Sequence, residues 1–255
     1  MPQDTLEEVL AVLRKLRPDQ LARVGAFARA LAEPPDVTCG KAGFATLDFV
    51  HRFGDALRLH HLFSHEPFTK DKFEHAMVAA LNQTGHKATL APRGNPGHDL
   101  TVDNERWSLK TQADRNIKRD TLHISKFMEL GKGRWETVAD LAGLRDQMLH
   151  HMRSYDRIFS LRCFRTPMIG NVIQFEYELV EIPKSLLLRA KDGELRLVES
   201  SKQTPKPGYC TVTGKSRLLL FQLYFDGGTE RKLQIKELGK SSCTVHATWR
   251  ITAQE

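Results

Sequence analysis

The stretch Asn95-Pro-Gly-His-Asp-Leu-Thr-Val-Asp-Asn-Glu-Arg-Trp-Ser-Leu-Lys-Thr-Gln112 has the pattern of a β-hairpin. Asp103-Asn104 is a plausible two-residue turn between antiparallel strands. That turn pairs Val102 with Glu105, Leu100 with Trp107, and Asp99 with Ser108. The turn therefore fixes the register of the whole hairpin.

The register assigns each side chain to one face of the hairpin, because side chains alternate along a strand. One face is apolar and consists of Leu100, Val102, Trp107 and Leu109. The other face carries Asp99, Thr101, Ser108 and Lys110. Asp99 and Lys110 become diagonal neighbours across the strands, within reach of one ligand.

A carboxylate and an ammonium on one strand face have two interpretations. A carboxylate oxygen is a hard ligand that suits a hydrated magnesium ion, and an ammonium can orient a water and stabilise charge on a phosphate. The simpler interpretation is an exposed ion pair, which stabilises a fold by less than about 1 kcal/mol. The hairpin alone does not separate the two.

Composition places the chain among ordinary globular proteins. It has 255 residues, of which 40% are hydrophobic and 27% charged, enough for one large domain with a helical appendage. No run of about 18 apolar residues and no signal-peptide pattern is present, so we expect a cytoplasmic protein with no membrane partner. The four cysteines lack the Cys-x-x-Cys spacing of a zinc knuckle, which favours reduced thiols.

The basic charge favours a polyanionic partner. The formal net charge is +7 at pH 7, and attraction to phosphate grows with the number of neutralised charges. One basic cluster follows the hairpin and contains Arg115, Lys118, Arg119, Lys126, Lys132 and Arg134. A second cluster contains Lys202, Lys206, Arg231, Lys232, Lys236 and Lys240.

Periodicity and capping signals predict the order of the elements. Helices are expected at 6–16, 18–31, 46–63, 69–84, 135–154 and 183–188. Strands are expected at 87–91, in the hairpin, and at 157–164, 171–182, 217–225, 231–238 and 242–251. This order predicts a mixed α/β domain with one core, preceded by an accessory or dimer-supporting pair of helices in residues 1–45.

An acid before a hairpin with a lysine in its second strand resembles the PD-(D/E)xK nuclease superfamily. The resemblance implies an α/β fold with a mixed central β-sheet flanked by helices. Blocks in the same order over roughly residues 45–250 are similar to the SmaI-type restriction endonucleases. They include Phe73-Glu-His-Ala76, Asn95-Pro-Gly-His-Asp99, Leu109-Lys-Thr111, Met128-Glu-Leu-Gly-Lys-Gly133, Leu179-Val-Glu-Ile-Pro-Lys-Ser-Leu-Leu-Leu188, Lys202-Gln-Thr-Pro-Lys-Pro-Gly-Tyr209 and Tyr224-Phe-Asp-Gly-Gly228.

Carried over residue by residue, the resemblance implies a set of site residues. Asp99 is expected to be a metal ligand, Lys110 the catalytic lysine, and the Leu109 carbonyl a second ligand. Ser108 stands where the superfamily usually has an acid, so one carboxylate is missing from the hairpin. Glu74 on the preceding helix is the preferred replacement, as catalytic residue and metal ligand, and Gln112 is the next candidate.

The resemblance also implies an activity and partners. We expect an endonuclease domain at 46–255, with its catalytic core at about 69–182 and DNA-recognition elements at about 200–250. The expected reaction is Mg²⁺-dependent hydrolysis of double-stranded DNA that leaves 5′-phosphate and 3′-hydroxyl ends. SmaI-type enzymes are associated with CCCGGG, cut at its centre to blunt ends. A palindromic target implies a homodimer, and restriction implies a cognate DNA methyltransferase in the same system.

Candidate DNA contacts come from the two basic clusters. Lys232, Gln234 and Lys236 share one strand face by alternation, and lysine and arginine pair well with guanine; this strand could instead contact phosphates only, or be a solvated edge. The segment after the hairpin is expected to clamp the backbone near the cut. The candidates are Arg115, Asn116, Lys118, Arg119, Lys126, Lys202, Lys206, Arg231, Lys232, Gln234 and Lys236.

Two other functions stay open. One is a structure-selective repair nuclease on the same scaffold, which would cut junctions or flaps without sequence preference. The other is a sequence-specific DNA-binding protein with an inactive site, which the serine at position 108 keeps in consideration. Discrete fragments from a plasmid digest would separate restriction from both.

Overall fold

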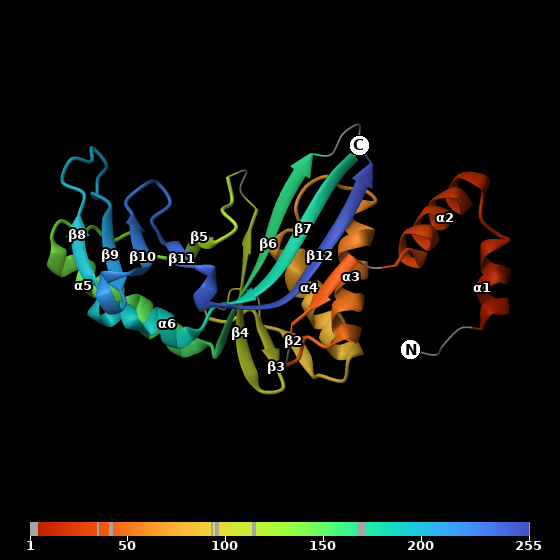
Figure 1. Ribbon diagram of the computed structural model, residues 1–255, viewed down its shortest axis with the longest axis horizontal. Coiled ribbons are helices and arrows are strands. Elements are labelled where there is room, and N and C mark those ends of the chain that lie inside the picture. Colours follow the sequence, from red (N-terminus) through yellow and green to blue (C-terminus); the bar gives the residue numbers. More distant parts are fainter. Residues whose placement is uncertain are drawn as a thin grey trace.

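Two β-sheets organise the part of the chain that the structure describes (Figure 1). The structure is a computed structural model, and it describes residues 5–34, 36–40, 43–92, 94, 97–113, 116–167 and 172–254. The larger sheet has the strand order β1-β12-β7-β6-β4-β3-β2, and the smaller has the order β5-β11-β10-β9-β8. Helices cover both sheets, so the predicted mixed α/β class is confirmed.

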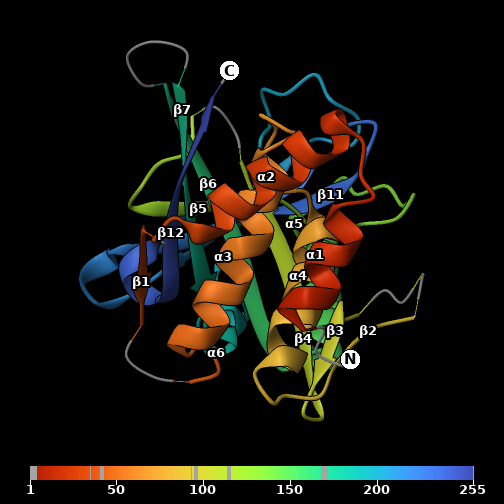
Figure 2. The same ribbon diagram turned by 90° about the vertical axis from the view of Figure 1, so that its right-hand side faces the viewer.

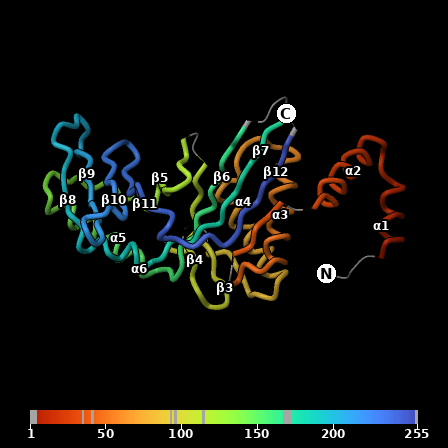
Figure 3. Tube along the Cα trace, viewed as in Figure 1, coloured from red at the N-terminus to blue at the C-terminus, as the bar shows by residue number. Residues whose placement is uncertain are grey.

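The strands of the larger sheet are antiparallel except for the pair of β4 and β6, which makes the sheet mixed. In chain order they are β1 (Asp36–Cys39), β2 (Ala88–Leu90), β3 (Leu100–Val102), β4 (Glu105–Gln112), β6 (Arg157–Pro167), β7 (Val172–Glu181) and β12 (Thr244–Gln254). The chain trace in Figure 3 shows that β12 returns from the smaller sheet to lie beside β7.

The smaller sheet is antiparallel throughout its described pairs. Its strands are β5 (Thr121–Glu129), β8 (Glu194–Leu197), β9 (Gly208–Thr213), β10 (Leu219–Asp226) and β11 (Lys232–Gly239). The helices of the chain are α1 (Leu6–Leu13), α2 (Pro18–Ala32), α3 (Leu47–His61), α4 (Lys70–Gln83), α5 (Val138–His151) and α6 (Lys184–Leu188). Short 3₁₀ turns are η1 (Met152–Ser154), η2 (Arg189–Asp192), η3 (Lys215–Arg217) and η4 (Lys240–Ser242).

The predicted hairpin is present with the predicted register. Asp103 and Asn104 have φ values of 48° and 76°, the left-handed conformation that a tight hairpin turn of this type requires at both positions. Leu100 pairs with Trp107, and Val102 with Glu105. The Asp103 carboxylate accepts a hydrogen bond from Lys87 N at 2.8 Å, which ties the tip of the hairpin to the segment that follows α4.

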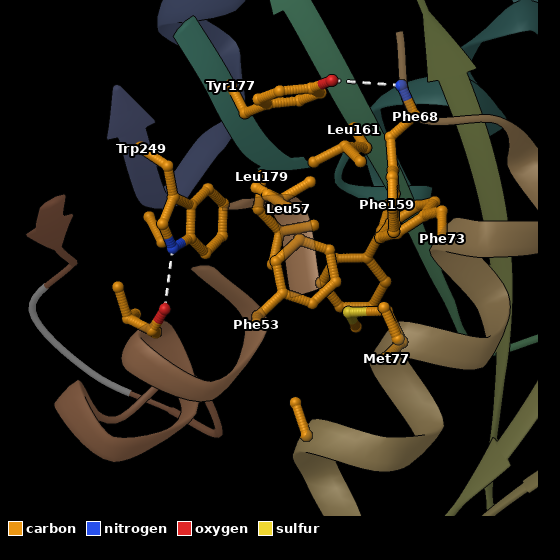
Figure 4. Close-up of a cluster of buried hydrophobic side chains, with 14 of the residues drawn as sticks. Phe53, Leu57, Phe68, Phe73, Met77, Phe159, Leu161, Tyr177, Leu179 and Trp249 are labelled. Carbon is orange, nitrogen blue, oxygen red and sulfur yellow. Dashed lines mark hydrogen bonds between the residues drawn. The ribbon is translucent and has the colours of Figure 1, made fainter. Parts of the chain in front are cut away.

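One hydrophobic core lies between the larger sheet and helices α3 and α4. The helix faces that cover the sheet are apolar, with residues at helical spacing. They include Phe53 and Leu57 of α3 and Phe73 of α4, which are fully buried. Figure 4 shows the Phe53 ring between Phe73 and Trp249 of β12, whose indole N–H donates to Val50 O at 2.7 Å. This core holds α4 rigidly against the sheet that carries the hairpin.

A second core lies between the smaller sheet and α5, so the expectation of a single core is wrong. The two cores meet at the middle of the larger sheet, where Phe159 of β6 belongs to the first and its neighbour Ile158 to the second. Alternation along β6 and β7 thus covers both faces of the central strands. The order of elements along the sequence did not show that these strands pack against two separate hydrophobic cores.

Four strands were not predicted, namely β1, β5, β8 and β9. Strand β5 has a broken burial pattern because its pairing with β11 shifts register twice, and an irregular strand loses the alternation that reveals it. The strands β1 and β8 have only 4 residues each. The predicted helix at 6–16 ends earlier, at Leu13.

The first two helices stand apart from the two cores in Figure 1, and Figure 2 views the molecule from the side on which they lie. Residues 5–34 are described throughout, and no residue of α1 or α2 is buried. They are attached through the Phe27 ring, which packs on the Phe63 ring at 5.1 Å, and through Arg58, whose guanidinium donates to Glu33 O at 2.8 Å. Among the described residues, no helix is both long and apolar enough to cross a bilayer.

Candidate active site

Asp99 stands immediately before β3, where the hairpin begins. Its backbone N–H donates to Trp107 O at 2.8 Å, and its carbonyl accepts from Ala91 N at 2.9 Å. Both bonds continue the antiparallel ladder beyond the end of β3. The pairing that sets the register of the hairpin therefore also fixes the position of Asp99.

The two oxygens of the Asp99 carboxylate have different partners: hydrogen bonds from β4 hold one, and the Lys70 ammonium contacts the other. Oδ2 accepts from Leu109 N at 2.6 Å and from Ser108 Oγ at 3.4 Å. Oδ1 accepts from Lys70 Nζ at 2.7 Å. Ser108 is fully buried, and its hydroxyl supports Asp99 rather than replacing the acid that is usual at this position.

Lys70 brings the two acids together. Its ammonium lies 2.7 Å from Asp99 Oδ1 and 3.2 Å from Glu74 Oε1, and Lys70 and Glu74 are neighbours one turn apart on α4. We call Lys70, Glu74 and Asp99 the Lys70 triad. The helix that was expected to supply the missing carboxylate thus places Glu74 beside Asp99.

Burial and the charges of the triad together shift the pKa values of its two helical members. Burial of the ammonium favours the neutral form of Lys70, but the hydrogen bond and charge of Asp99, joined by Glu74, outweigh it and raise the pKa of Lys70. Burial also raises the pKa of Glu74, against the opposing effect of Lys70. The ammonium is therefore strongly held in its charged form between the two acids.

Lys110 lies on the same side of the hairpin, close enough to Asp99 for their charges to interact. Its Nζ sits 5.7 Å from the centre of the Phe127 ring. Burial lowers the pKa of Lys110 to about 8, and attraction to Asp99 only partly offsets this effect. A lysine of this kind releases or shares a proton near neutral pH far more readily than a surface lysine.

A groove runs along β5 between the two sheets. One cavity of about 350 Å³ reaches the triad, and its lining residues are Lys70, Lys110, Thr111, Ile124, Ser125, Lys126, Phe127 and Met128. A neighbouring cavity of about 350 Å³ is lined by Gln112, Asn116, Ile117, Lys118, Thr121, His123, Ser125, Lys236 and Glu237. The cavities share Ser125, and together we call them the β5 groove. Its many lysines make it suitable for a polyanion.

Several predicted DNA contacts are paired with acids in the free protein. Lys118 bonds Glu237 at 2.9 Å, and Arg119 holds Glu176 with two hydrogen bonds. Such exposed pairs are weak and can be exchanged for phosphate. Other predicted contacts are also paired: Lys126 with Glu129 and Glu230, Lys206 with Glu199, and Lys232 with Glu230.

The remaining predicted contacts differ in accessibility. The Arg231 guanidinium is bound to the carbonyls of Lys132 and Gly133, whereas Lys202 is exposed. Arg115 lies outside the described residues, as do Asn95 and Pro96 of the turn predicted before the hairpin. The prediction for Arg115 therefore stays a prediction, whereas its neighbour Asn116 lines the groove.

The strand β11 presents Lys236 to the groove and keeps Gln234 behind it. Gln234 is buried, with its amide nitrogen donating to Asp226 Oδ2 at 3.0 Å and its oxygen 3.0 Å from His123 Nε2. Lys236 Nζ lies 3.6 Å from the centre of the Tyr224 ring. Of the two polar side chains, Lys236 is the one positioned to meet a ligand.

Gln112 does not join the triad. Its side-chain oxygen accepts from Arg162 Nε at 3.2 Å, and both residues are buried. Lys70, in contrast, was not predicted as a site residue, although its spacing from Glu74 on one helix was a readable signal. Its contact with Asp99 depends on how α4 docks against the hairpin, which the sequence pattern does not give.

The oxygen atoms around Lys70 fit a divalent cation. The carboxylates of Asp99 and Glu74 already converge on one positive charge, the Lys70 ammonium, and hard oxygen ligands are what Mg²⁺ prefers. In a strand the N–H and C=O of one residue point to the same edge, so the Leu109 carbonyl points toward the edge where its N–H meets Asp99. Among the described residues no group of three or more His, Cys, Asp and Glu could hold a metal, so carbonyl and water ligands would complete the shell.

Comparisons with known proteins identify the family of the chain. A family model named SmaI, described as type II site-specific deoxyribonuclease, matches residues 13–251. The type II restriction enzyme SmaI of Serratia marcescens is 48% identical over 203 residues, which cover 79% of each chain. No solved structure matches the chain.

Proposed function

The chain belongs to the SmaI family of type II site-specific deoxyribonucleases and is a restriction endonuclease with DNA as its substrate, and from this premise we propose its specificity and mechanism. We propose that it hydrolyses double-stranded DNA at CCCGGG, between the central bases, leaving blunt 5′-phosphate and 3′-hydroxyl ends. The family membership confirms the predicted enzyme class. The observation that carries the mechanism is the convergence of Asp99 and Glu74 on Lys70, which lines one cavity of the β5 groove together with Lys110.

Asp99, Glu74 and the Leu109 carbonyl are the proposed metal ligands. Type II restriction endonucleases generally depend on a divalent metal, and Mg²⁺ is our proposed ion. When bound, it would supply Lewis-acid charge at the phosphoryl oxygens and lower the pKa of a coordinated water. Leu109 N keeps Asp99 Oδ2 in place at 2.6 Å, so Oδ1, which Lys70 now contacts, is the oxygen that would bind the ion.

Lys110 is the proposed residue that positions the attacking water. Its ammonium extends from β4 into the cavity that Lys70 and Lys126 also line, so a phosphodiester in the groove would lie within reach of three positive charges. Burial lowers the pKa of Lys110 to about 8, which still leaves the amine mostly protonated at pH 7, so the side chain can donate a hydrogen bond to the water and stabilise the negative charge that develops on the phosphate.

The other end of the β5 groove is the proposed recognition surface. Lys236 and Asn116 line it, and lysine donates well to the O6 and N7 atoms of guanine in the major groove. Lys118, Arg119 and Lys126 are proposed phosphate contacts that exchange their acidic partners for DNA. Gln234, held by His123 and Asp226, is better suited to orienting this surface than to contacting bases in its present state.

The two-fold symmetry of a palindromic site matches two symmetry-related active sites, one for each strand, and we propose a homodimer. Helices α1 and α2 leave Leu6, Val9, Val12, Leu21 and Leu31 exposed, which supports their role in stabilising the dimer. A nuclease of this kind in the cytoplasm would also cut its own chromosome. A methyltransferase of the same system is therefore its proposed functional partner.

A digest of DNA of known sequence tests the proposal. With Mg²⁺ we expect discrete fragments whose ends, read by sequencing, fall at the centre of CCCGGG. Asp99→Ala and Lys110→Met should each lower the cleavage rate by at least about a hundredfold, while both variants still bind the duplex in Ca²⁺. Asp48→Asn, in the first turn of α3 and paired with Arg52 instead of a site residue, is the matched control and should cut at the wild-type rate.

The same digest separates the two alternatives. Cleavage confined to flaps or junctions, with no discrete plasmid fragments, would identify a structure-selective nuclease. Binding to a duplex without any cleavage under these conditions would identify an inactive DNA-binding protein. Wild-type cleavage by Asp99→Ala would refute the assignment of the site.

A further inference from the structure

Lys70 occupies the position where the proposed ligands need a metal. Its Nζ is 2.7 Å from Asp99 Oδ1 and 3.2 Å from Glu74 Oε1, while the other Asp99 oxygen is taken by Leu109 N. An ammonium and a divalent cation cannot both contact the same oxygen atoms at these distances, because their charges repel and their coordination spheres overlap. One must leave before the other binds.

We propose that Lys70 is an internal counter-ion that holds Asp99 and Glu74 together in the free protein and is displaced from them when the divalent metal binds. This inference rests on the proposed function, because it takes these two carboxylates as metal ligands. Lys70 is in this sense a positioning residue that sets how tightly the site binds metal. The sequence motifs that identified Asp99 and Lys110 gave it no role.

The surroundings of Lys70 give the displaced ammonium a place to go. Its side chain is 44% exposed and lines the cavity shared with Lys110 and Lys126. A flexible lysine stem can therefore swing from the carboxylates into the groove without leaving the site. There it would meet the phosphodiester, which replaces the two carboxylates as its anionic partner.

This exchange links metal binding to DNA binding. Without DNA, the metal has to displace an ammonium that keeps two charged hydrogen bonds, so its affinity is reduced. With DNA in the groove, the phosphate receives the ammonium and the same displacement becomes easier. Metal and DNA both favour the displaced position of Lys70, so each should raise the affinity for the other, and by the same factor.

Manganese titrations without DNA test the inference directly. Mn²⁺ binding to the wild type and to Lys70→Met, followed by calorimetry and by the loss of free Mn²⁺ signal in electron paramagnetic resonance, should show about tenfold or tighter binding to the variant. Lys72→Met is the matched control, because Lys72 is two residues away on α4 and contacts His60 instead of the triad. It should bind Mn²⁺ as the wild type does.

A second pair of variants keeps the test valid if Lys70→Met unfolds. Lys70→Gln removes the charge but keeps hydrogen-bond donors, and should also bind Mn²⁺ more tightly. Lys70→Arg keeps the positive charge and should bind Mn²⁺ as weakly as the wild type does. Equal or weaker Mn²⁺ affinity in a folded, uncharged Lys70 variant would overturn the inference.

The linkage to DNA gives an independent readout. We expect Ca²⁺ to raise the affinity of the wild type for a CCCGGG duplex by a larger factor than it raises that of Lys70→Met, because the variant has no ammonium to transfer. Equal factors would contradict the proposed exchange.

Asp99→Asn distinguishes failure of this inference from failure of the proposed function. If Asp99→Asn abolishes Mn²⁺ binding while Lys70→Met leaves it unchanged, only the role of Lys70 is refuted. If Asp99→Asn binds Mn²⁺ like the wild type, the metal site and the mechanism built on it are both wrong.

Discussion

Replacement of Arg162 by methionine should destabilise the protein more than any other single change at the edge of the groove. Arg162 is fully buried on β6. Its guanidinium donates to Glu178 at 2.7 Å, to Gln112 at 3.2 Å and to Thr121 O at 2.9 Å. It also binds the carbonyls of Lys118 and Arg119. One side chain thus ties β4, β7 and the segment leading into β5 together.

The magnitude follows from what the substitution leaves behind. Loss of one partner from a buried ion pair costs about 3–5 kcal/mol, and an unpaired buried carbonyl costs about 1–3 kcal/mol more. Glu178 keeps a second partner, Lys240 Nζ at 2.9 Å, which limits its share of the loss. We therefore expect the free energy of unfolding to fall by about 3–5 kcal/mol, a large part of the about 5–15 kcal/mol available to a typical domain.

Urea unfolding followed by circular dichroism measures this loss. Arg165→Met, three residues along β6 and exposed, is the control and should change stability by less than about 0.5 kcal/mol. The double variant Arg162→Met with Glu178→Gln should lose less than the two single losses together, because both remove the same pair. A loss below about 1 kcal/mol for Arg162→Met, or strict additivity in the cycle, would refute the reasoning.

Three further predictions concern other parts of the molecule. Burial raises the pKa of Glu181, but the Arg157 guanidinium and the His246 imidazole outweigh burial and lower this pKa from 4.5 to about 2. The carboxylate therefore contributes about 3 kcal/mol of stability that is complete above pH 4.5 and is lost as the pH falls to about 2. In urea titrations Glu181→Gln should be less stable than the wild type at pH 6 and approach its stability at pH 2.5, and a stability difference that does not change with pH would contradict this role of Glu181. Gly54→Ala should lower the thermal midpoint, because a Cβ there would lie 2.9 Å from the Trp249 ring, with a cost of about 1–3 kcal/mol; an unchanged midpoint in calorimetry would show that the ring can move. In fluorescence anisotropy, Lys236→Met should weaken Ca²⁺-supported binding to a CCCGGG duplex by about tenfold, and Tyr224→Leu should weaken it by less. If Lys236→Met loses the same affinity for an unrelated duplex, Lys236 contacts phosphate and not bases.

The local part of the fold was predictable because short-range chemistry decides it. The turn residues Asp103 and Asn104 fix the hairpin register, and the capping residue Thr5 marks where the first helix begins. The same register placed Asp99 and Lys110 near each other. These features depend on residues a few positions apart, which a single sequence displays.

The tertiary part was not predictable from pattern alone. Strand β5 was missed because its register shifts hide the alternation, so the groove that it lines was missed with it. The contact of Lys70 with Asp99 joins a helix to a hairpin across 29 positions of sequence. The full hydrogen bonding of Gln234 and the burial of Gln112 likewise come from partners on other strands. Such pairings are set by how packed elements dock, not by local spacing.

The division of the chain into two cores has a consequence for engineering. Lys70, Glu74, Asp99 and Lys110 all come from one short run of the chain that packs on the first core, whereas β8–β11 are built on the second. Under the proposed roles of these residues, substitutions on the exposed side of β11 would change which DNA is chosen and leave the four proposed cutting-site residues unchanged. Libraries that vary target choice should accordingly be confined to the smaller sheet, with the run from Lys70 to Lys110 transplanted intact.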